Sequence, residues 1–108
     1  MGFLHEFIQS MEKRPLMYLN DYNIDVLRAY LQGYFGGRYE TNNLDEDDES
    51  FGNFSFWVQE YYGEELTSHG WASVILYHEG SHRKAVEKFF ELYKEWYENP
   101  ENRLKTYV

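Results

Sequence analysis

The stretch SHRKAVEKFFELYKEWYE, residues 81–98, decides the fold class. Its apolar side chains recur at the three- and four-residue steps of an α-helix, which places them on one face. These are Ala85, Val86, Phe89, Phe90, Tyr93, Trp96 and Tyr97, and the opposite face carries Glu87, Glu91, Glu95 and Glu98. Ser81 is a favoured N-cap and Asn99-Pro100 stops a helix. The pattern predicts an amphipathic helix over 81–98 and a polar tail after it.

Three upstream segments show the same helical spacing, at residues 2–11, 24–35 and 51–62. Lys13-Arg14-Pro15 is expected to end the first, Gly36-Gly37 the second and Gly63 the third. Asn23 or Asp21 can cap the second helix. Its apolar stripe is Ile24, Leu27, Tyr30, Leu31 and Tyr34.

Residues 71–77, WASVILY, fit a buried strand or a buried helix equally well by periodicity. Thr67 and Ser68 upstream resemble helix caps, and this favours a helix in which Trp71, Ile75 and Tyr77 or His78 share a face. The sequence therefore predicts an all-α fold. We expect a single domain over residues 1–108, a bundle of four to five helices with an acidic loop between the second and third.

Composition narrows the possible functions. The 108 residues contain no cysteine, so disulfides, thiolate metal sites and cysteine nucleophiles are excluded. Nineteen acidic residues against ten basic ones give a net charge of −9, which repels nucleic acid and anionic membranes and favours a basic partner. No signal peptide or membrane-spanning apolar run is evident. We expect a cytoplasmic protein with no membrane and no direct nucleic-acid partner.

One stretch matches a catalytic pattern. His78-Glu79-Gly80-Ser81-His82 satisfies H-E-x-x-H, the motif of zinc hydrolases. The motif needs both histidines on one continuous helix, whereas glycine disfavours a helix interior and serine favours a cap. A junction between two helices near 79–81 is therefore the preferred interpretation, with zinc hydrolysis as a remote alternative. We expect neither an enzyme nor a cofactor.

A binding surface is the remaining candidate. The acidic loop carries five consecutive carboxylates, Asp45, Glu46, Asp47, Asp48 and Glu49. They predict either a solvated loop or a docking site for a cationic partner. Eleven tyrosines exceed what a core of this size hides easily, and tyrosine is a preferred interface anchor. Tyr39, Trp57, Tyr61 and Tyr62 lie close to the loop in sequence, and we expect Tyr61 and Tyr62 to contribute to partner binding as aromatic anchors.

Several motifs occur in an order that resembles a known family. These are K-R-P-L-M-Y-L (13–19), L-x-x-Y-L-x-G-Y (27–34), F-W-V-x-x-Y-Y (56–62), Gly70-Trp71 with Ile75, and A-V-x-x-F-F-x-L (85–92). They resemble small all-helical immunity proteins of bacterial polymorphic toxin and contact-dependent growth inhibition systems. The resemblance covers about residues 3–97 and rests mainly on core-type residues.

The resemblance implies inhibition by tight, stoichiometric binding to a cognate basic toxin domain, often a nuclease, inside the producing cell. Such families have no catalytic residues, and their contact residues vary, so none transfers to a position here. A strongly acidic protein without a catalytic constellation agrees with this function. An acidic regulator of another basic host protein is the alternative. The oligomeric state stays open.

Overall fold

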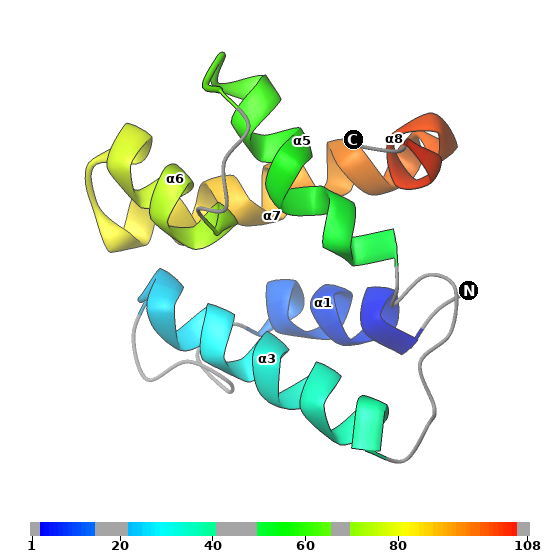
Figure 1. Ribbon diagram of the computed structural model, residues 1–108. Coiled ribbons are helices and arrows are strands. Elements are labelled where there is room, and N and C mark those ends of the chain that lie inside the picture. Colours follow the sequence, from blue (N-terminus) through cyan, green and yellow to red (C-terminus); the bar gives the residue numbers. More distant parts are fainter. Residues whose placement is uncertain (1–2, 15–21, 41–49, 66–69, 106–108) are drawn as a thin grey trace.

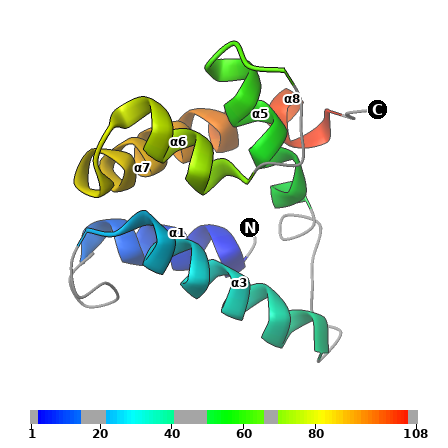
Figure 2. The same ribbon diagram turned by 60° about the vertical axis from the view of Figure 1, so that its left-hand side comes forward.

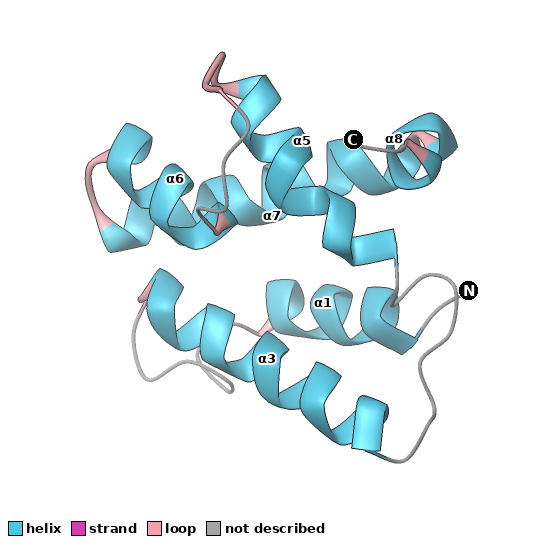
Figure 3. Ribbon diagram, in the orientation of Figure 1, coloured by secondary structure: helices cyan, strands magenta, loops and turns pink. Residues whose placement is uncertain are grey.

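The computed structural model describes residues 3–14, 22–40, 50–65 and 70–105. It has six α-helices and one 3₁₀ helix in these ranges, and no strand (Figure 3). They are α1 (Phe3–Lys13), α3 (Ile24–Glu40), η1 (Phe51–Asn53), α5 (Phe54–Tyr61), α6 (Trp71–Glu79), α7 (His82–Glu98) and α8 (Pro100–Leu104). The all-helical prediction is confirmed. None of the described helices is long and apolar enough to span a bilayer.

The helices are arranged around α7. Helices α3, α5, α6 and α8 all pack against it, while α1 and α3 lie side by side beneath (Figures 1 and 2). The predicted stripe of α7 is buried except at Tyr97, which is half-buried, because the strongly apolar face can leave water only by packing on its neighbours. Phe54, Phe89 and Trp96 are among the largest fully buried side chains, and the Phe54 ring packs edge-on against the other two.

The start of α3 follows the predicted cap. Asn23 Oδ1 accepts hydrogen bonds from the backbone N–H groups of Asp25 and Val26, at 2.9 and 3.2 Å. Ile24, Leu27 and Leu31 are buried as the stripe requires, but Tyr30 is 43% exposed and does not belong to the core. The stripe was therefore placed correctly except at Tyr30.

One predicted helix end is wrong, and the segment predicted as a polar tail forms a further helix. Helix α3 continues through Gly36 and Gly37 to Glu40, because a glycine ends a helix when its backbone turns left-handed, and among the described residues only Gly63 and Gly80 have positive φ. The polar tail after Asn99 forms α8 instead. Asn99 Oδ1 accepts from the N–H of Glu101, and Pro100 occupies the first helical turn, where its missing N–H costs nothing.

Candidate functional site

The structure describes the two predicted tyrosines but not the five predicted carboxylates. Asp45, Glu46, Asp47, Asp48 and Glu49 lie outside the described residues. Tyr61 and Tyr62 lie at the C-terminal end of α5. Gly63 has φ of 72° and ends this helix in a left-handed turn, in which Glu64 N–H donates to Gln59 O at 2.9 Å. This turn exposes Tyr61, of which 45% is accessible.

Tyr62 is held by two contacts with the end of α6. Its hydroxyl donates a hydrogen bond to Glu79 Oε2 at 2.7 Å, and its ring stacks on His78 with centroids 4.1 Å apart and planes 4° from parallel. Burial, followed by the hydrogen bond to Glu79, raises the pKa of Tyr62 well above its usual range. The phenol is therefore neutral at physiological pH and acts as a donor that fixes the carboxylate.

His78 continues this cluster toward Glu64. His78 Nε2 lies 3.5 Å from Glu64 Oε2, and the ring of Tyr77 stands edge-on to the imidazole at 5.1 Å. Tyr77 is 79% exposed, which is unusual for a large aromatic ring. The sequence allowed either Tyr77 or His78 on the buried face of α6, whereas both are exposed. No signal in the sequence pairs Glu64 and Glu79 with these rings, because the contacts join separate helices.

Helix α7 supplies the remaining side of the cluster. Lys88 Nζ lies 5.3 Å from the centroid of the Tyr61 ring and 3.7 Å from Glu91 Oε2. A hydrogen bond with Tyr61 raises the pKa of Lys88, although burial acts in the opposite direction. Lys88 is therefore charged here, and its ammonium lies over the face of the Tyr61 ring.

We call this cluster the aromatic–acidic surface. Its members are Tyr61, Tyr62, Tyr77, His78, Glu64, Glu79, Lys88 and Glu91. Three carboxylates against one ammonium leave it negative. It combines exposed aromatic rings with carboxylates that are already oriented, which suits a cationic protein partner.

The H-E-x-x-H stretch has the predicted junction. Helix α6 ends at Glu79, Gly80 adopts φ of 85°, and Ser81 Oγ accepts from the N–H of Lys84 at 3.3 Å as the N-cap of α7. His82 Nδ1 accepts a hydrogen bond from the N–H of Ile24 at 3.3 Å. The ring of His78 instead stacks on Tyr62 and lies beside Glu64. The two imidazoles belong to different helices and different contacts, so the one-helix geometry of a zinc hydrolase is not formed.

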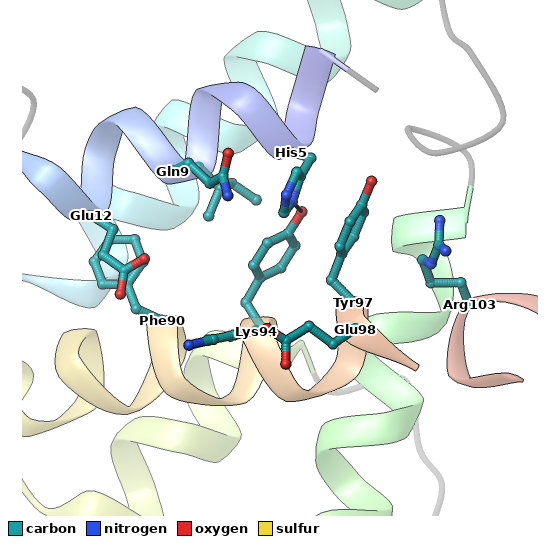
Figure 4. A pocket seen from close by; sticks show the side chains of 10 residues that line it. His5, Gln9, Glu12, Phe90, Lys94, Tyr97, Glu98 and Arg103 are labelled. Carbon is teal, nitrogen blue, oxygen red and sulfur yellow. Dashed lines mark hydrogen bonds between the residues drawn. The ribbon is translucent and has the colours of Figure 1, made fainter. Parts of the chain in front are cut away.

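A pocket of about 460 Å³ opens between α1 and α7 (Figure 4). Sequence reasoning did not find it, because it requires two helices from opposite ends of the chain. His5 on α1 spans its end: His5 Nδ1 and the Tyr93 hydroxyl are 3.0 Å apart, and the imidazole stacks on Tyr97 at 3.7 Å. Arg103 of α8 covers Tyr97, with its guanidinium carbon 4.5 Å from the ring centroid.

Comparison with known proteins gave no match to a protein-family model, to a curated protein or to a solved structure. Every helix or strand in the described ranges is a helix, and a fold class of this kind does not by itself define a function.

Proposed function

We propose that this protein is an immunity protein that binds a cognate basic toxin domain, a nuclease being the expected class, and neutralises it by stoichiometric occlusion. The observation that carries the proposal is the aromatic–acidic surface. There, Tyr61 and Tyr77 expose their rings beside the carboxylates of Glu64 and Glu79. The net charge of −9 adds a long-range attraction for the same kind of partner.

The rings supply the apolar part of the binding energy. Aromatic side chains are enriched among the few residues that dominate interface energies, and tyrosine loses little conformational entropy when it is covered. Tyr77 is the most exposed aromatic ring of this surface. Removal of its ring is therefore expected to weaken binding more than removal of any single charge.

The carboxylates supply specificity for a cation. Glu79 accepts the hydrogen bond of Tyr62, and Glu64 lies beside His78, so both are oriented before a partner arrives. Such preorganisation lowers the entropic cost of forming ion pairs with partner arginine or lysine side chains. The loop carboxylates, Asp45, Glu46, Asp47, Asp48 and Glu49, are proposed to extend the negative field and accelerate association.

The test starts from the DNA directly upstream of this gene, which we expect to encode a toxin that ends in a basic domain. Coexpression of the wild-type protein with that domain is expected to restore growth, and titration calorimetry is expected to give a one-to-one complex. Tyr77→Ala should raise Kd about tenfold or more. Replacing Glu64, Glu79 and Glu91 together with glutamine should raise Kd and reduce its dependence on salt.

The matched control removes the same charge elsewhere. The control is a triple variant that combines Glu6→Gln, Asp25→Asn and Glu101→Gln. These three residues lie in the first turns of α1, α3 and α8, and none belongs to the aromatic–acidic surface. Equal weakening by the control and by the surface triple would remove this surface from the proposal. Failure of the wild-type protein to restore growth would refute the proposal of immunity. If the protein bound the basic domain but did not restore growth, the alternative function, an acidic regulator of another basic host protein, would be favoured.

A further inference from the structure

The pocket between α1 and α7 has an apolar floor and a polar rim. Ile8, Phe90 and Tyr93 form its floor and are all buried, with exposed fractions of 1%, 7% and 4%. Gln9 and Glu12 extend from α1, and Lys94 and Glu98 from α7 (Figure 4). A volume of about 460 Å³ falls within the range of small-molecule sites, and this pocket presents more polar than apolar surface to a ligand.

Side-chain contacts fix the spacing of α1 and α7 at one end of the pocket. The contacts of His5 with Tyr93 and Tyr97 join α1 to α7, and Arg103 covers the Tyr97 ring. These aromatic groups already contact one another, so a ligand would be recognised by the rim rather than by this stack. The structure therefore provides a preformed site whose shape does not depend on the ligand.

The rim carries both signs of charge without internal pairing. Within the described part of the chain, the side chains of Gln9, Glu12, Lys94 and Glu98 make no hydrogen bond or ion pair. Two carboxylates and one ammonium therefore line the same pocket, with an amide donor and acceptor beside them, and the guanidinium of Arg103 over Tyr97 is a second cation in its lining. A purely anionic ligand would meet the carboxylates, and a purely cationic one would meet Lys94.

We infer that this pocket binds a small zwitterion with an apolar body, of the chemical class of an amino acid or a short peptide. The ligand ammonium pairs with a rim carboxylate, that of Glu12 or Glu98, its carboxylate pairs with Lys94, and its apolar body lies on the floor at Phe90. This site is separate from the aromatic–acidic surface, with which it shares no residue. Its occupation requires no toxin partner.

The test is a titration of the whole chain followed by amide chemical shifts in ¹⁵N-labelled protein. L-phenylalanine and glycyl-L-phenylalanine represent the two sources of the zwitterion, while phenethylamine and 3-phenylpropionate each lack one charge. We expect at least one zwitterion to bind with Kd of about 1–5 mM. The shifts should be confined to α1 and α7, and each single-charge analogue should bind at least about threefold more weakly. The tighter of the two zwitterions identifies a free amino acid or a chain terminus as the source.

Rim variants then test the assigned roles. Lys94→Met, and separately Glu12→Gln with Glu98→Gln, should each raise Kd about threefold or more. Glu95→Gln, an exposed neighbour on α7 outside the pocket, should leave Kd unchanged. These positions are exposed, and the spectrum of each free variant verifies that it is folded. The inference is overturned by an absence of shifts up to about 20 mM ligand, by equal binding of a single-charge analogue, or by an unaffected Lys94→Met variant.

Discussion

Alanine substitutions at glycine should have opposite effects on stability in two parts of the fold. Gly33 and Gly36 lie within α3, and a Cβ added at either would meet no atom within 4 Å. Both positions are exposed and their backbones are right-handed helical. Because alanine is favoured over glycine in a helix interior by about 0.8–1.0 kcal/mol, Gly33→Ala with Gly36→Ala should stabilise the protein by about 1–2 kcal/mol.

Gly80 provides the contrasting case. It also has open space around its Cα, but its φ of 85° lies in the left-handed region. A side chain in that conformation costs roughly 1–2 kcal/mol, so Gly80→Ala should destabilise the protein by this amount. The sign of the effect is thus set by the backbone alone, since no clash occurs at any of the three positions.

The assay is thermal and urea unfolding followed by far-ultraviolet circular dichroism. A change of 1 kcal/mol corresponds to a shift in Tm of about 4–8 °C for a domain of this size, so both effects are measurable. An unchanged urea m-value would show that only stability has changed. A lower Tm in the α3 double variant would refute the reasoning, because it would mean that this face of α3 is covered or not helical.

Two further predictions concern hydrogen bonds. Tyr62→Phe should cost about 1 kcal/mol of unfolding free energy, because Glu79 loses its donor. It should leave the tyrosinate absorbance of the folded protein unchanged up to about pH 11, since the raised pKa of Tyr62 keeps its phenol protonated there. The sign follows: this stabilisation is complete below the ordinary tyrosine pKa of about 10 and is lost as the pH rises above it. A loss of one titrating tyrosine below pH 11 would contradict the assignment. Ser81→Ala and Asn23→Ala should each cost about 1 kcal/mol, measured by urea unfolding, while Ser73→Ala, an exposed residue inside α6, should change stability little; equal costs at all three would contradict the capping roles.

The helices with a continuous apolar stripe were predictable from the sequence. Helix α7 begins and ends where its cap and stop residues indicated, because Ser81 caps its first turn by a local hydrogen bond and Asn99, which precedes Pro100, adopts an extended backbone. Gly36 was misjudged for a physical reason. A glycine permits a left-handed turn but does not require one, and the sequence does not report which of the two backbones each glycine adopts. Helix α8 did carry a signal, since Asn99-Pro100-Glu101 combines an N-cap, a proline at the first position and an early acid.

The candidate site was predictable only in part. Tyr61 was selected as an exposed aromatic residue and is exposed. The partners of Tyr62 could not be found from the sequence, because Glu79 lies 17 positions away on another helix and meets it through tertiary packing alone. Tyr77 was misplaced for a related reason: the apolar run of α6 has no polar face to mark which side leaves the core. The placement of the loop carboxylates stays a prediction.

The break at Gly80 that separates the two histidines also builds the aromatic–acidic surface. The N–H of Gly80 donates the last helical hydrogen bond, to Leu76 O, and the left-handed backbone of Gly80 then ends α6 with His78 and Glu79 at its terminus. The chain reverses there into α7, so the end of α6 is free to meet Tyr62 at the end of α5. A continuous helix through Gly80 would carry residue 82 along the axis of α6 and remove His82 from the N–H of Ile24. The residues that spell a zinc motif are thus better explained as the turn that caps α3, starts α7 and positions the aromatic–acidic surface.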